Sequence, residues 1–259
     1  MVTIKKSEEI VVLRQGGRIL AQVLQQLVMA AQPGVTTLAL DQLAEKLILE
    51  AGGLPAFKNY RGHADEDPFP STICASVNTQ LVHTAASDYV LKNGDILSID
   101  IGMKYPAKDP GYFTDMTTTI PIGSVSPIAR KVIRVTKKSL DIGLAQIKEG
   151  NYISDIGRAI QQYVESEGFS VVRELVGHGV GYAVHEDPRI PNYYDKRNDD
   201  VQLKEGMVLA IEPMVNVGHY AIKTAPDGWA VVTADDSLCA HFEHTIVVTK
   251  KGCEIITLP

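Results

Sequence analysis

Hydrophobic residues recur at helical spacing in two segments near the start of the chain. In residues 7–32 the apolar positions fall three or four apart, Ser7 is the expected N-cap, and a Pro-Gly pair follows. Residues 37–51 repeat this spacing and end at Gly52-Gly53. The pattern predicts two consecutive amphipathic helices.

A second pair of helices is predicted in the other half of the chain. Residues 126–148 open with Ser-Pro, the usual N-cap followed by proline at the first helical position, and residues 154–167 follow after a glycine. A shift of 116 residues aligns the glycines that follow corresponding helices, Gly34 with Gly150 and Gly52 with Gly168. We therefore expect two related halves.

Alternating or β-branched segments follow each helix pair. They predict strands at residues 71–77, 96–103, 113–120, 169–175, 207–217, 229–233 and 244–248. No Pro/Ser-rich linker separates the halves, so we expect a single α/β (α+β) domain over residues 1–259.

Composition and charge narrow the class of protein. The 259 residues carry a formal net charge of -6, and no basic run suggests a nucleic-acid partner. The three cysteines lie far apart without a CxxC pair, which is typical of a reducing compartment. The first residues lack the apolar core of a signal peptide, and no apolar run approaches the roughly 20 residues of a membrane span. We expect a cytoplasmic protein.

Four acidic residues interrupt the predicted strands. Asp100 lies in "SIDIG", Asp115 in "YFTDMTTTI", Glu212 in "LAIEPMV" and Glu243 in "HFEHTIVV". A carboxylate in such a run is costly to desolvate unless it is paired, and several together repel one another. Because the segments hold almost no basic residues, metal cations are the natural counter-ions.

The stretch "GHGVGYAVHEDP" adds two histidines, His178 and His185, on either side of a glycine-rich segment that predicts a bend. Four carboxylates and one imidazole form a hard, oxygen-rich donor set that suits divalent Mn, Fe, Co or Zn. The four carboxylates formally balance two such ions, which bridging carboxylates hold roughly 3.5–4 Å apart. The residues thus predict two divalent metal ions that activate a water.

The motifs "GHGVG…HEDP", "IEPMV" and "FEHTIVV", together with the two strand aspartates, resemble the type I, short bacterial form of methionine aminopeptidase. The resemblance covers nearly the whole chain. It implies the pita-bread metallopeptidase fold, in which two pseudo-symmetric helix-helix-strand halves surround a central antiparallel sheet and enclose a dinuclear site.

The resemblance also implies roles for individual residues. The implied metal ligands are Asp100, Asp115, His178, Glu212 and Glu243. The implied catalytic residues are His83, His185 and Glu212, with both histidines contacting the substrate and Glu212 also passing protons. The implied side-chain pocket is formed by Phe57, Tyr60, Phe69, Cys74 and Trp229.

The activity implied by the resemblance is hydrolysis of the first peptide bond of a new polypeptide. The two metal ions would supply a hydroxide that attacks the carbonyl, and His185 would stabilise the oxyanion. The implied partner is the N-terminal methionine of nascent peptides. Association with the ribosome is suggested by the family alone, and we expect a monomer that binds neither nucleic acid directly nor a membrane.

The sequence departs from the family pattern in several places. "KYPAKDP" lengthens the connection from Asp100 to Asp115, and "GHADEDP" is inserted before Phe69. Thr84 follows His83 where the family usually has glycine, and Val184 precedes His185 where it has a bulky aromatic residue. These changes affect substrate preference and leave the five implied ligands intact.

Two further histidines, His241 and His244, flank Glu243. We expect both to point away from the Glu243 carboxylate and to serve packing.

Three alternatives remain on sequence grounds. A proline-specific aminopeptidase or dipeptidase has the same fold but usually an additional N-terminal domain. A non-catalytic peptide-binding relative tends to lose metal ligands, and a metal-independent amidinohydrolase does not need the full set.

Overall fold

The computed structural model describes residues 2–62, 67–195 and 200–259. Its helices are α1 (Ser7–Ala30), α2 (Thr37–Glu50), α3 (Pro127–Leu144) and α4 (Ile153–Ser166). α2 and α4 both have 14 residues, and their first and last residues are 116 apart (37 to 153, 50 to 166). The predicted repeat therefore coincides with the observed helices.

The glycines aligned by this repeat share a backbone conformation. Gly34 and Gly150 have φ of 94° and 92°, and Gly52 and Gly168 have φ of 81° and 83°. Such left-handed values favour glycine because it lacks a Cβ atom. The two halves therefore leave their second helices through the same turn.

The helix starts follow local chemistry. The Ser126 side chain accepts a hydrogen bond from Ala129 N, with proline at the start of α3, as expected. The prediction of Ser7 as an N-cap is wrong by one residue. Lys6 is the N-cap of α1, and its N–H is satisfied by the Glu9 carboxylate at 2.7 Å.

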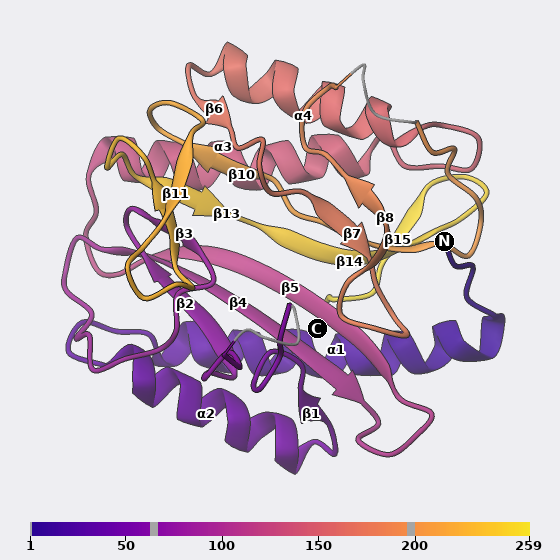
Figure 1. Ribbon diagram of the computed structural model, residues 1–259, viewed down its shortest axis with the longest axis horizontal. Helices are drawn as coiled ribbons and strands as arrows, with labels where there is room; N and C mark the ends of the chain where they lie inside the picture. Colours follow the sequence, from indigo (N-terminus) through magenta and orange to yellow (C-terminus); the bar gives the residue numbers. More distant parts are fainter. Residues whose placement is uncertain (1, 63–66, 196–199) are drawn as a thin grey trace.

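A nine-stranded antiparallel sheet lies between the two helix pairs (Figure 1). Its main path runs β1-β4-β5-β14-β9-β7-β8, with β2 pairing β4 and β15 pairing β14. The bounds are β1 (Leu54–Pro55), β2 (Ile73–Val77), β4 (Ile96–Tyr105), β5 (Tyr112–Pro121), β7 (Gly177–Gly179), β8 (Glu186–Ile190), β9 (Val208–Ile211), β14 (Glu243–Val248) and β15 (Cys253–Ile255).

Two three-stranded sheets complete the fold. The first has the order β13-β10-β6, and the second β11-β12-β3. Their bounds are β3 (Gln80–Val82), β6 (Ser170–Val171), β10 (Met214–Asn216), β11 (Ile222–Thr224), β12 (Val231–Thr233) and β13 (Cys239–His241).

The strand predicted at residues 207–217 is wrong as a single element. It is two strands, β9 and β10, which belong to different sheets and are separated by Glu212 and Pro213. Proline cannot donate a hydrogen bond to a ladder, so the chain leaves one sheet there and enters another. Glu212 therefore lies at a switch between sheets. The strand predicted at 169–175 is also much shorter, reduced to β6.

The hydrophobic core has one main cluster in each half. The first packs α1 and α2 against β2 and β4, and the second packs α3 and α4 against β9 and β14. β5 of the first half pairs directly with β14 of the second, with Thr117 opposite Glu243. Four of the five implied ligands lie on or beside the strands that flank this seam. Within the described residues, no helix is long and apolar enough to cross a bilayer.

Candidate metal centre and active site

Antiparallel register places two acidic residues in one row of the sheet and a third on the same face. Asp100 on β4 pairs with Thr117 on β5, and Thr117 pairs with Glu243 on β14, so the three form one row across the sheet. Asp115 lies two residues before Thr117 and therefore points to the same face. The Thr117 hydroxyl donates to Glu243 Oε2 at 2.8 Å, which fixes one carboxylate of the row.

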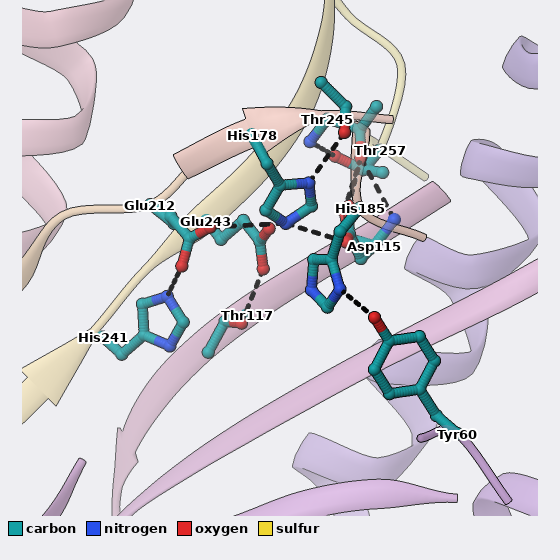
Figure 2. A network of polar contacts seen from close by, with 11 residues as sticks. Tyr60, Asp115, Thr117, His178, His185, Glu212, His241, Glu243, Thr245 and Thr257 are labelled. Atoms are coloured by element: carbon teal, nitrogen blue, oxygen red, sulfur yellow. Dashed lines mark hydrogen bonds and ion pairs between the residues drawn. The ribbon is translucent and has the colours of Figure 1, made fainter. Parts of the chain in front are cut away.

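His178 and Glu212 approach this row from the second half of the protein (Figure 2). His178 Nε2 lies 3.6 Å from Asp115 Oδ2 and 3.4 Å from Glu212 Oε1. Asn192 donates from its side chain to the Glu212 carbonyl at 3.0 Å, which anchors the backbone where it leaves β9. The structure thus brings all five implied ligands into one site.

Hydrogen bonds orient two of the ligands. His178 Nδ1 lies 2.9 Å from the carbonyl of Gly179, so this nitrogen carries the proton and Nε2 is left as an electron-pair donor. The Thr245 hydroxyl lies 3.0 Å from Asp115 Oδ1. Donor atoms from neighbouring strands are therefore held facing one another before any ion binds.

The pKa values of the clustered carboxylates indicate that the site favours positive charge. Burial, followed by repulsion from neighbouring carboxylates, raises the pKa of Asp100 to about 7 even though His241 partly opposes the shift. Burial also raises the pKa of Glu212 to about 8 and the pKa of Glu243 well above its ordinary value. Without a cation the carboxylates are costly to ionise together.

The donor set fits divalent cations. Ligand atoms of Asp115, His178 and Glu243 all lie within 4.8 Å of one another. Asp100 and Glu212 line the same cavity and interact with this group electrostatically. Oxygen donors with one imidazole suit Mn, Fe, Co or Zn.

Two histidines lie at the cavity next to the carboxylates. His185 Nδ1 is 2.8 Å from the Tyr60 hydroxyl, and the His185 ring packs edge-on to His178 with centroids 4.5 Å apart. Burial and the nearby His178 lower the pKa of His185 to about 3. His83 has the left-handed φ of 57°, and burial lowers its pKa to about 4. Both imidazoles are therefore neutral near pH 7.

A cavity of about 600 Å³ extends from the carboxylates and contains every residue of the implied side-chain pocket. Phe69 and Trp229 meet edge-to-face with ring centroids 5.3 Å apart. Cys74 is buried and pairs with Asp100 across β2 and β4, so its side chain lies beside a ligand. Phe57 and Tyr60 also line the cavity, whose lining thus combines aromatic rings and a sulfur with the carboxylates.

His241 corrects the expectation that it points away from the site. It is buried and lines the cavity, and its Nε2 lies 3.5 Å from Glu212 Oε2. Within the described part of the chain, neither ring nitrogen has a hydrogen-bond partner. The sequence spacing could have indicated this position. His241 lies two residues before Glu243, and residues two apart on an extended chain share a face. His244, at an odd offset, instead contacts Thr257 through Nδ1 at 2.9 Å.

The structure places several of the departures from the family pattern. Residues 63–66 of the insertion fall outside the described residues. The longer connection after Asp100 closes a regular hairpin, with Tyr105 paired to Tyr112 and Lys104 bound to Asp109 at 2.6 Å. Thr84 is buried behind His83.

Comparison with known proteins agrees with the geometry. A family model described as metallopeptidase family M24 matches residues 12–250. The chain is 49% identical over 257 residues to methionine aminopeptidase 1 of Bacillus subtilis (strain 168), covering 99% of each chain. It superimposes on the crystal structure of methionine aminopeptidase from Thermotoga maritima with a TM-score of 0.93 at 38% identity, covering both chains completely.

Proline-specific relatives share only the fold. The prolidase from Pyrococcus horikoshii is 23% identical with a TM-score of 0.76, and the match covers 98% of this chain but 63% of that one.

Proposed function

The chain belongs to metallopeptidase family M24, and from this we propose that it is a methionine aminopeptidase that removes the N-terminal methionine of nascent polypeptides. One observation carries the proposal. Four carboxylates, of which Asp115, Glu212 and Glu243 are buried, converge with His178 at a cavity that aromatic rings and the Cys74 sulfur also line. A peptide bond held over the carboxylates would direct its first side chain into that cavity.

Two divalent cations would be held by Asp100, Asp115, His178, Glu212 and Glu243. When bound, such ions supply a water of lowered pKa and a Lewis acid for the carbonyl oxygen. The donor set suits Mn, Fe, Co or Zn.

Glu212 is the residue proposed to move protons. It follows the end of β9 and lies between His178 and His241, so its carboxylate faces the cavity from a backbone position that Asn192 anchors. It would take a proton from the attacking water and deliver it to the leaving amine.

His185 is proposed to stabilise the developing oxyanion. If the Tyr60 hydroxyl donates to Nδ1, the proton of the neutral imidazole must be on Nε2. Nε2–H is then free to donate to the carbonyl oxygen as it gains charge. His83, which also lines the cavity, would contact the substrate near its amine.

The pocket chemistry supports methionine as the first residue. A flexible thioether gains from contact with aromatic rings and a neighbouring sulfur. Phe57, Tyr60, Phe69 and Trp229 supply the rings, and Cys74 supplies the sulfur.

The cellular setting of the enzyme is part of the same proposal. We propose that residues 1–259 act as one catalytic domain, as a monomer in the cytoplasm. Contact with the ribosome is proposed because the substrate is a nascent chain. The spread of cysteines without a disulfide is compatible with a reducing compartment.

The decisive experiment compares two peptides on the metal-supplemented protein. We expect Met-Ala-X to be cleaved after methionine in the presence of Mn or Co, with Ala-Pro-X a much poorer substrate. Faster cleavage of Ala-Pro-X would favour the proline-specific class. A protein that stays inactive on both peptides after each cation is added would favour a peptide-binding role.

A further inference from the structure

The carboxylate of Glu186, the residue after His185, is the centre of a partly buried hydrogen-bond cluster. Glu186 Oε1 accepts the backbone N–H groups of Tyr182 and Ala183, the latter at 3.1 Å. Glu186 Oε2 accepts Lys5 Nζ and Thr3 Oγ1, each at 2.6 Å. One side chain thus ties the turn before His185 to the N-terminal segment.

The N-terminal segment crosses this turn as a strap, which we define as residues Thr3 to Lys5. Figure 1 shows the start of the chain beside β8, and Lys5 N donates to the Gly206 carbonyl at 2.9 Å. The side chains of the Lys5–Glu186 pair are only 1% and 9% exposed. Lys5 Nζ also lies 4.6 Å from the centre of the Tyr182 ring.

The Lys5 side chain of the strap lies against the turn at Gly181. A Cβ atom on Gly181 would lie 2.5 Å from Lys5 Cε, and Gly181 has φ of 137°. Gly181, the last glycine of the "GHGVG" motif, therefore suits both the bend of the backbone and the contact with the strap. The motif accommodates a residue 176 positions earlier in the chain.

The turn controls where His185 can be. Residues 180–185 connect β7 to β8, and Gly179 pairs with Glu186 across these strands. His185 is held at its ring by Tyr60 and at its backbone by the turn that Glu186 closes. An imidazole that must meet a developing charge loses effect when it is displaced by about 1 Å.

We propose that Lys5 and Glu186 are positioning residues, and that the strap of residues 3–5 sets the placement of His185 over the reacting carbonyl. This inference rests on the role proposed above for His185. Glu186 is among the residues that line the cavity, but in this proposal neither Lys5 nor Glu186 bonds the substrate. Their effect is carried through the Tyr182–Ala183 turn.

The test is a double-mutant cycle between Lys5→Met and His185→Ala in the full, metal-supplemented chain. We expect Lys5→Met to lower kcat about tenfold while KM changes less than about twofold, because the pocket is untouched. In the His185→Ala background, Lys5→Met should have no further effect on kcat, since the group it positions is gone.

A second variant and a second measurement keep the test independent of folding. Removing one partner of a buried ion pair leaves an uncompensated charge, so the neutral pair Lys5→Met/Glu186→Gln is made as well and is expected to show the same loss of kcat. Hydrogen exchange of the Tyr182 and Ala183 amides should become faster in both variants. Arg14→Met, which breaks the exposed Arg14–Glu254 pair, is the matched control.

Two outcomes would overturn the proposal and are distinguishable from each other. If Lys5→Met lowers kcat by the same factor with and without His185, the strap acts through general stability and the inference fails while the role of His185 stands. If His185→Ala alone leaves kcat unchanged, the proposed role of His185 fails and the inference fails with it.

Discussion

At the scale of the residue, the site depends on which atoms of each side chain are already engaged. His178 donates from Nδ1 to the Gly179 carbonyl, and its Nε2 faces the carboxylates. His185 directs Nδ1 to Tyr60 and leaves Nε2 toward the cavity. The same residue type therefore serves two purposes, because the hydrogen bond at one nitrogen decides the role of the other.

His185→Ala tests the oxyanion role. We expect kcat to fall by roughly 10²–10³, the usual effect of removing one oxyanion donor, with a smaller change in KM. Steady-state kinetics on a methionine-initiated tripeptide measure it. An alanine variant as fast as the parent would exclude His185 from the reaction.

His241→Leu tests the residue that sequence spacing did not bring into the site. His241 Nε2 lies 3.5 Å from Glu212 Oε2, so leucine replaces a polar neighbour of that buried carboxylate with an apolar one. We expect kcat to fall about tenfold, corresponding to about 1.4 kcal/mol in the barrier. His241→Gln, which can still donate, should stay within about threefold of the parent. Equal activity of the two variants would show that His241 only fills space.

At the scale of the element, buried carboxylates also join helices to strands. Asp41 on α2 is buried, and its Oδ1 accepts the backbone N–H groups of Thr72 at 2.7 Å and Ile73 at 3.0 Å, where β2 begins. α2 is thus fixed to β2, the strand that carries Cys74.

Asp41→Ala is expected to lower the free energy of unfolding by about 2–4 kcal/mol, because two buried N–H groups lose their acceptor. Asp41→Asn retains an acceptor oxygen and should cost about 1 kcal/mol or less. Urea denaturation followed by circular dichroism measures both. The argument fails if the alanine variant is as stable as the asparagine variant.

The connection between β12 and β13, which holds Asp235, gives a pH prediction. Backbone N–H donation from His219 and the Ser237 hydroxyl lower the pKa of Asp235 to about 2. Because the folded pKa lies below the ordinary 3.8, the contribution of Asp235 to stability is complete above about pH 4 and is lost as pH falls through about 2.

The amide chemical shift of His219 should follow that titration, with a midpoint near 2. Asp235→Asn should abolish the pH dependence of this amide. Asp236→Asn, which changes the neighbouring acid that faces Lys223, should leave it unaltered. A midpoint near 3.8 in the parent protein would contradict the assignment.

At the scale of the whole molecule, the site is formed by residues from both halves. β4 and β5 of the first half supply Asp100 and Asp115, while the second half supplies His178, Glu212 and Glu243. The halves meet where β5 pairs with β14. A cation bound there would connect both helix-helix-strand units, and its binding energy would add to the stability of the native state.

Manganese or cobalt at about one hundred times its dissociation constant is expected to stabilise the protein by about 2.7 kcal/mol, which raises Tm by about 5–10 °C. A chelator should reverse the shift. Asp115→Asn should abolish most of it, whereas Asp88→Asn, at an exposed loop position, should retain it in full. A Tm that is indifferent to these cations would count against a metal centre.

Much of the architecture could be predicted along the chain. The four helices are confirmed, with ends displaced by a few residues, because each has its own apolar periodicity and terminating glycine. The resemblance to a metallopeptidase family and its pita-bread fold is also confirmed by the family match and the superposition. The roles of the individual site residues stay predictions that the experiments above address.

Local patterns were less informative where the chain changes partners. β7 and β8 were not predicted, because three and five residues around glycine and proline carry no clear alternation. The pattern of residues 207–217 predicts one strand. The switch between sheets at Glu212-Pro213 could not be predicted, because it depends on which strands lie beside this segment in the folded protein.

The sequence by itself determined the helix pairs, the repeat of 116 residues and the set of acids embedded in apolar strands. These features are local, or depend on residue types whose desolvation has a fixed cost wherever they fold. Only the tertiary structure decided that Asp100, Thr117 and Glu243 form one row, that His241 faces Glu212, and that Lys5 reaches Glu186. Strand register and contacts between distant segments decide those facts, because a shift of one residue would turn every such side chain to the other face of the sheet.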